Sequence, residues 1–222
     1  MIVYHPNYVE IMKQFVIDFT VAFVASVPAL FVALFFDRLR MPKLKIITDE
    51  NANADNTYSP GSGAHAGERW KFFRVRVINL PFPWLLRWIP RYAAENCRAQ
   101  ISFTKVGDEK KSFSMLGRWS STPELVYISN DPALKVLYPD PVTIPVNESE
   151  LIDIVAKFEN EKDAWGWNNA SYFNNWRTPA YKLERGKYLV KVTVSTQGGS
   201  SFVNNFGLQI TDKIEDISFG PK

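Results

Sequence analysis

Side chains that could act as nucleophiles, general bases or metal ligands are few in this chain of 222 residues. It has two histidines, His5 and His65, and a single cysteine, Cys97. The histidines lie on either side of a long apolar segment, so a membrane crossed by that segment would separate them. We therefore expect neither a histidine dyad nor a histidine-rich metal site. Cys97 lies in an alternating stretch, where one cysteine is typically a small buried hydrophobic residue.

Acidic residues form two groups in the sequence, at positions 148–153 and 212–216. The groups consist of Glu148, Glu150 and Asp153, and of Asp212, Glu215 and Asp216. Neither has the loop spacing of a calcium site, so we interpret both as solvated charge. Gly198 and Gly199 indicate a turn, not a phosphate-binding loop. The net charge is only +3 and the cations are not clustered, which does not indicate nucleic-acid binding. We expect no enzymatic activity, cofactor or metal.

A first aromatic segment, PFPWLLRWIPRY at positions 81–92, is too apolar for an ordinary solvent-exposed loop. Tryptophan and tyrosine favour the headgroup layer of a bilayer, where cations meet anionic lipid. The residues that we predict to contact a membrane are Trp84, Leu85, Arg87, Trp88, Ile89 and Arg91. The alternative is that the loop folds over the end of the domain and adds to its core.

A second aromatic segment, WGWNNASYFNNWR, occupies positions 165–177. Interleaved aromatic and amide side chains are typical of surfaces that bind sugars or proteins. The residues that we predict to bind a partner are Trp165, Trp167, Tyr172 and Trp176. The alternative is that these aromatic residues close one end of the domain.

The element that must place both segments is the apolar run Phe15–Phe36, which follows a short leader at positions 1–14. As a helix its 22 residues would span about 33 Å, enough for a bilayer core of about 30 Å. A cleaved signal peptide and a buried core helix are the competing interpretations. Lys13 alone flanks the first end, whereas Arg38, Arg40, Lys43 and Lys45 flank the second. The positive-inside rule thus predicts a single-pass protein of the cell membrane with a cytoplasmic C-terminal domain.

Small residues repeat every fourth position in this run, at Ala25, Ala29 and Ala33. Such a stripe could bring two helices together in a homo-oligomer, although alanine is also common in membrane helices. Because Cys97 is the single cysteine, no intramolecular disulfide can form, as is usual for a protein of a reducing compartment.

Residues 42–222 are predicted to form one antiparallel β-sandwich, because period-two patterns dominate and no strong helical period occurs. The candidate strands are 43–48, 70–78, 97–103, 112–119, 124–128, 142–146, 151–158, 187–194 and 202–210. The segment 49–68 is an excursion between the first two strands. Gly186 and Tyr188 resemble the tyrosine corner of immunoglobulin-like domains, in which a tyrosine hydroxyl bonds to upstream backbone.

The stretches VRVIN (75–79), AAENCRAQI (93–101) and GRW (117–119) together resemble a pattern in uncharacterised prokaryotic, notably archaeal, proteins. Those proteins often carry an N-terminal membrane helix before an immunoglobulin-like β-sandwich. The resemblance implies this fold and implies no activity. This chain departs from the pattern by the insertion NLPFPWLLRWIPRY between the first two stretches.

These observations together predict a non-enzymatic interaction or scaffold module that is held at the cytoplasmic face of the membrane. Its lipid contact would be Phe15–Phe36, and its protein partner is unknown. The first strand leaves the membrane, so the second should return to it and place the loop at 81–92 against lipid. The alternative is an anchored, outward-facing domain that binds carbohydrate or protein through the second aromatic segment.

Overall fold

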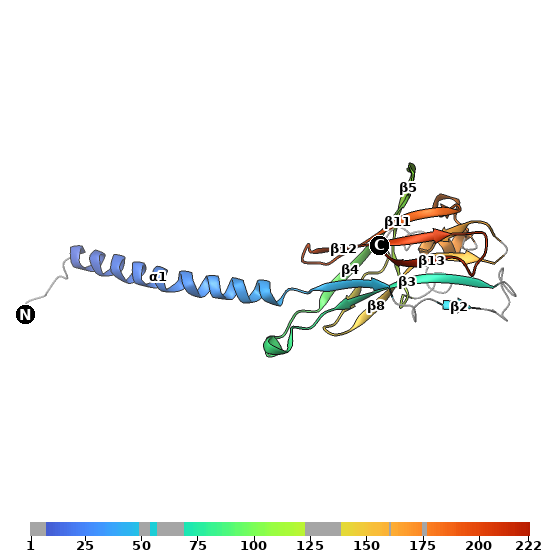
Figure 1. The fold of residues 1–222 in the computed structure, drawn as a ribbon. Helices are drawn as coiled ribbons and strands as arrows, with labels where there is room; N and C mark the ends of the chain where they lie inside the picture. The colour runs from blue at the N-terminus through green and yellow to red at the C-terminus, as the bar shows by residue number, and fades with distance from the viewer. Residues whose placement is uncertain (1–7, 49–53, 57–68, 123–138, 160, 175–176) are drawn as a thin grey trace, which may run out of the picture.

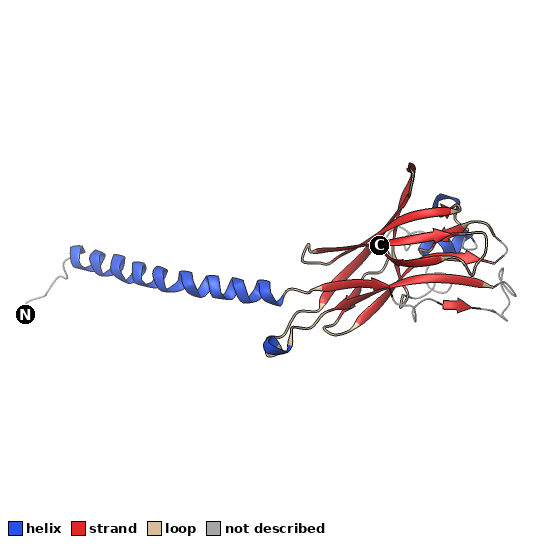
Figure 2. Cartoon of the chain, viewed as in Figure 1, coloured by secondary structure: helices blue, strands red, loops and turns tan. Residues whose placement is uncertain are grey.

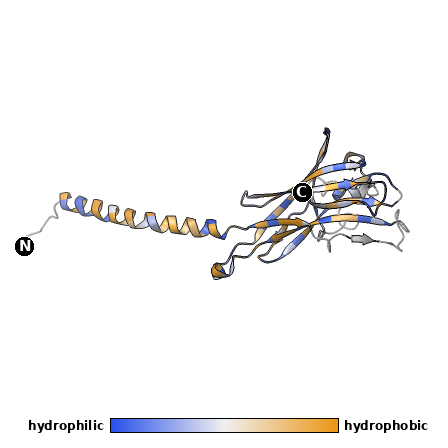
Figure 3. Ribbon diagram, viewed as in Figure 1, coloured by the Kyte–Doolittle hydropathy of each residue, from blue (hydrophilic) through white to orange (hydrophobic). Residues whose placement is uncertain are grey.

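The computed structural model describes residues 8–48, 54–56, 69–122, 139–159, 161–174 and 177–222, and consists of a long helix followed by a β-sandwich (Figure 1). Helix α1 (Tyr8–Arg40) has 33 residues, none of them buried. Hydrophobic residues cover most of it, and hydrophilic residues lie near its two ends (Figure 3). The helix extends beyond the predicted 15–36 in both directions. It is long and apolar enough to span a membrane.

Two antiparallel sheets form one body beyond the end of α1 (Figure 2). In the first sheet the strand order is β1-β3-β8-β9-β10, while β2 pairs with β3 and β6 pairs with β8. Its strands are β1 (Leu44–Thr48), β2 (Ala54–Asn56), β3 (Trp70–Asn79), β6 (Arg118–Trp119), β8 (Ser149–Phe158), β9 (Ala164–Gly166) and β10 (Lys182–Leu183).

The second sheet has the order β13-β12-β11-β4-β5, and β7 pairs with β4. Its strands are β4 (Ala94–Lys105), β5 (Asp108–Leu116), β7 (Val142–Ile144), β11 (Gly186–Ser195), β12 (Ser201–Ile210) and β13 (Ser218–Pro221). Among the described residues, three short 3₁₀ helices occupy connections: η2 (Trp84–Leu86), η4 (Asn169–Asn174) and η5 (Pro179–Tyr181). The mainly β, sandwich prediction is therefore confirmed. The candidate strand at 124–128 lies outside the described residues.

One predicted strand, 112–119, is divided between the sheets. β5 ends at Leu116, and after Gly117 the chain enters β6, which pairs with β8 of the first sheet. A Cβ at Gly117 would lie 2.6 Å from the Cβ of Ala99, so only glycine allows this close crossing.

The core lies between the sheets and is formed by alternate residues of the strands. On β11 these are Tyr188, Val190, Val192 and Val194, the set predicted from the sequence to share one face. Trp119 is also buried, and its indole N–H donates to the carbonyl of Cys97 at 3.2 Å. Cys97 is fully buried, as predicted.

The start of β11 has the hydrogen bond expected of a tyrosine corner. The Tyr188 hydroxyl donates to the carbonyl oxygen of Glu184 at 2.9 Å. Between them Gly186 has φ +147°, which favours glycine. Burial of the phenol raises the pKa of Tyr188 to about 12.

Candidate functional site

The end of the sandwich next to α1 is assembled by the antiparallel pairing of β1 and β3. β1 starts at Leu44, just after α1 ends at Arg40, and Leu44 pairs with Asn79 at the end of β3. β3 therefore returns to the helix, and the connection from β3 to β4 lies at this end (Figure 1). We call this connection, residues 80–93, the helix-proximal loop. The strand pairing therefore places this loop at the end of the domain next to α1, as the sequence predicted.

Tyr92 joins the helix-proximal loop to the last turn of α1. Its backbone N–H donates to the carbonyl of Arg40 at 2.7 Å, and its hydroxyl donates to Asp37 Oδ1 at 3.0 Å. The Arg40 guanidinium lies 4.5 Å from the centre of the Tyr92 ring, within cation–π range. One residue thus holds the end of α1 by backbone, hydroxyl and ring.

Two arginines complete this junction. Arg40 Nε donates to the carbonyl of Pro90 at 2.9 Å, and Arg91 Nη1 donates to the carbonyl of Met41 at 3.2 Å. The Arg91 guanidinium also lies 4.1 Å from the ring centre of Phe82, which is buried. Arg91, predicted from the sequence to meet lipid, therefore points inward and holds the loop to the helix.

Asn79 is the fully buried polar residue on which the helix-proximal end is built. Its amide Nδ2 donates to the carbonyls of Tyr92 and Ile144, both at 3.1 Å, and its Oδ1 accepts the N–H of Lys43 at 3.4 Å. These contacts tie together the start of β1, the end of the loop and β7. The asparagine of the VRVIN stretch thus has a structural role.

Asn96, in the AAENCRAQI stretch, lies where β4 changes register against β7. It has φ +49°, the left-handed conformation that asparagine tolerates better than most residues. Its side-chain amide donates to Gln197 Oε1, which links β4 to the turn after β11. The next residue, Cys97, is buried, and desolvation raises the pKa of its thiol to about 11. A neutral buried thiol is not an activated nucleophile.

The exposed part of the helix-proximal loop is its tip. Trp84, Leu85 and Trp88 are 75%, 64% and 72% exposed, and Arg87 is exposed beside them. Ile89, in contrast, is only 5% exposed. Its N–H donates to the carbonyl of Leu86, and the turn that this bond closes leaves Ile89 on the protein side. The expectation that Ile89 reaches lipid is therefore corrected, and the loop both displays apolar residues and adds to the core.

The second aromatic segment lies elsewhere, on the outer face of the first sheet. Trp167 is 6% exposed and its ring lies 5.2 Å from that of Trp70, which stacks almost parallel on Phe158 at 6.1 Å. Trp165 packs against the same cluster, and its indole N–H donates to Glu161 at 2.6 Å. Trp167 is thus a core residue and not the exposed anchor that the sequence suggested. Tyr172 belongs to η4, and Trp176 lies outside the described residues.

Asp153 is also buried, contrary to its interpretation as solvated charge. It accepts hydrogen bonds from Arg74 at 2.6 Å, Arg118 at 2.5 Å and Ser120 at 2.7 Å. The register shift between β3 and β8 at Phe73/Arg74 sets Arg74 opposite Asp153. A buried carboxylate needs such compensation, so this network joins β3, β6 and β8 as a structural unit.

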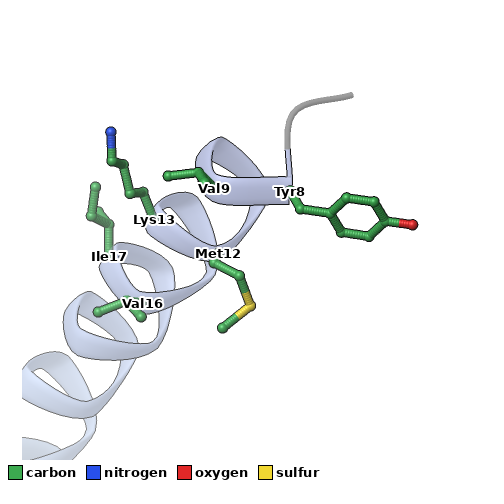
Figure 4. A pocket seen from close by; sticks show the side chains of 6 residues that line it. All are labelled: Tyr8, Val9, Met12, Lys13, Val16 and Ile17. Atoms are coloured by element: carbon green, nitrogen blue, oxygen red, sulfur yellow. The ribbon is translucent and has the colours of Figure 1, made fainter. Parts of the chain in front are cut away.

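A hollow beside the first turns of α1 is lined by Tyr8, Val9, Met12, Lys13, Val16 and Ile17 (Figure 4). All six belong to one helix, and the hollow has no opposing wall, so it is a groove between exposed side chains. Over the part of the chain that the structure describes, no group of three or more His, Cys, Asp or Glu residues could hold a metal. His5 and His65 lie outside that part.

Comparisons of the chain with protein-family models, with curated proteins and with solved structures found no match.

Proposed function

We propose that this chain is a non-enzymatic interaction or scaffold module, anchored in the cell membrane by α1 with its β-sandwich at the cytoplasmic surface. The observation that carries the proposal is the junction between helix and domain. Three residues separate α1 from β1, and Tyr92, Arg40 and Arg91 fasten the helix end to the sandwich. Such a junction suits a domain that acts at a fixed place and orientation on the bilayer.

The distribution of charge supports the cytoplasmic side. Arg38, Arg40, Lys43 and Lys45 lie at the domain end of the helix. Before the apolar run the sequence contains one Lys or Arg, Lys13. Positive charge is retained on the cytoplasmic side of single-span proteins, so this asymmetry favours a cytoplasmic domain.

The strand order supports an immunoglobulin-like sandwich. One sheet contains the order β1-β3-β8 and the other β12-β11-β4-β5. These orders correspond to strands A-B-E and G-F-C-C′ of immunoglobulin domains, and the Tyr188–Glu184 hydrogen bond corresponds to their tyrosine corner. We also propose that this chain is related to the prokaryotic, archaeal-type membrane-anchored proteins that its sequence resembles. Sandwiches of this kind host many binding functions, so fold alone names no partner.

The outward-facing alternative has less support from the side chains. It requires an exposed aromatic surface at positions 165–176, but Trp167 is buried and Trp165 is bonded to Glu161. Two of its four proposed contact residues therefore contribute to the domain's own packing.

Protease accessibility tests the proposed sidedness. A full-length chain with an epitope tag after Lys222, which is exposed, would be expressed in cells and treated with protease before and after permeabilisation. We expect the tag to survive in intact cells and to be removed after permeabilisation. Removal of the tag from intact cells would overturn the cytoplasmic placement and favour the outward-facing alternative.

A further inference from the structure

The tip of the helix-proximal loop displays three large apolar side chains and a cation that none of the described elements covers. We propose that this tip, formed by Trp84, Leu85, Arg87 and Trp88, inserts into the headgroup layer of the bilayer that α1 spans. The tip would then be a second membrane attachment, and the inference rests on the proposed anchoring by α1.

The position of the tip follows from the junction. The apolar run of α1 ends at Phe36 and cations follow at Arg38 and Arg40, so residues 37–41 mark the level of the headgroups. The base of the loop is bonded to these residues, through Tyr92 to Asp37 and through Arg91 to Met41. The small helix η2 projects from the strands toward α1 (Figure 1). The tip therefore lies at the end of the domain from which α1 departs, close to the level of residues 37–41.

The chemistry of the tip fits a bilayer interface. Indole rings prefer the headgroup layer, where the apolar ring is shielded and the N–H remains solvated. Arg87 adds a charge that anionic headgroups attract, and Lys43 and Arg38 are exposed at the same end. The side chains that would oppose insertion are absent from the tip, because no acidic residue occurs between positions 81 and 92.

The tip is also held in shape before it meets lipid. Leu86 N–H donates to the carbonyl of Pro83 at 2.9 Å, and Ile89 N–H donates to that of Leu86 at 3.0 Å. Ile89 and Phe82 are buried, and they fix the two sides of the loop to the domain. Because the rings are presented on ordered backbone, insertion would cost little conformational entropy.

The distribution of tryptophan in the chain provides the test. The chain has seven tryptophans and α1 contains none, so fluorescence reports only on the domain. The full-length protein would be reconstituted in vesicles of phosphatidylglycerol and phosphatidylcholine, with or without lipids brominated near the headgroup end of the acyl chain. We expect bromine to quench the fluorescence of Trp84 and Trp88. If all seven tryptophans emit equally, the lost intensity should approach two sevenths of the total emission.

Matched variants assign the signal. The W84F/W88F double variant keeps the aromatic surface but removes the reporters, and we expect it to lose the quenching. The control W165F changes a tryptophan on β9, whose partner in β8 lies toward the opposite end of the sandwich. This variant should retain the quenching. Equal emission of the wild type with and without bromine would overturn the inference. Failure of the protein to float with vesicles would instead overturn anchoring by α1.

Discussion

Replacement of Asn79 tests whether the helix-proximal end depends on one buried amide. Asn79→Ala removes two N–H donors, to the carbonyls of Tyr92 and Ile144, and the acceptor for Lys43 N–H. Ile144 is fully buried, so water cannot replace the lost donor there, whereas Tyr92 is exposed and can be rehydrated. The damage should therefore be concentrated where β7 and β3 meet.

The expected cost follows from these three contacts. Loss of an ordinary hydrogen bond costs about 1 kcal/mol, and a buried group left without a partner costs about 1–3 kcal/mol. The Ile144 carbonyl is left buried without a partner, whereas the bond to Tyr92 is an ordinary hydrogen bond. Asn79→Ala should therefore lower the free energy of unfolding by about 2–4 kcal/mol. That is a large part of the 5–15 kcal/mol typical of a domain.

Urea unfolding of the full chain in detergent, followed by tryptophan fluorescence, would measure this cost. The matched control is Asn205→Ala on β12, where the asparagine is exposed and the change should be within about 0.5 kcal/mol. If Asn79→Ala cost no more than this control, Asn79 would not organise the junction.

Asn79→Asp adds a pH test of the same site. The carboxylate keeps the shape of the amide but places negative charge against two carbonyl oxygens, so its pKa in the folded state should rise above the usual value of about 3.9. A folded-state pKa above the unfolded one means that stability is highest at low pH and falls as pH rises. Asn79→Asp should therefore be less stable than Asn79→Ala at pH 7 and recover on acidification. A pH-independent deficit would refute the role of the two N–H donors.

Three further outcomes follow from the packing. Tyr188→Phe, which removes the bond to Glu184, should cost about 1 kcal/mol in urea unfolding without changing the circular dichroism spectrum. Because burial raises the pKa of Cys97 from 9 to about 11, the stability that this thiol contributes is present below pH 9 and is lost as pH rises to 11. The loss is about 3 kcal/mol, and Cys97→Ala should flatten that part of a pH titration of the unfolding midpoint. Trp167→Ala should cost about 3–5 kcal/mol, whereas Trp84→Ala, at an exposed ring, should change the unfolding midpoint little.

Residues with a clear local period could be predicted from the sequence. The alternation at 187–194 identified β11 and its buried face, and the apolar run from Phe15 identified most of α1. The order of the first two predicted strands, which are β1 and β3, was enough to place the helix-proximal loop, because an antiparallel partner must return to the end where the first strand began.

Contacts between distant segments could not be predicted in this way. The sequence around Trp167 is typical of an exposed aromatic residue. Trp167 is buried because Trp70 and Phe158, which are distant in the sequence, pack beside it on the outer face of the first sheet. The sequence of β8 offered one signal, since Ile154, Val155 and Ala156 are consecutive apolar residues, and a strand covered on both faces loses its alternation. In the structure all seven residues from Ile152 to Phe158 are buried. The burial of Asp153 depends on a register shift that single-sequence periodicity does not reveal.

The residues on which the sequence resemblance rests have their structural roles close to the helix-proximal end. Asn79 joins β1, β7 and the loop, Asn96 allows the register change at the start of β4, and Trp119 bonds to the carbonyl of Cys97 in the core beside it. None of the three carries an exposed reactive group. We infer that a pattern of this kind specifies how a sandwich is built next to an N-terminal helix, and that proteins that share it would share this junction whatever they bind. The segment inserted into the pattern, with Trp84 and Trp88 at its tip, is where this chain differs, and it is the part that we propose meets the lipid.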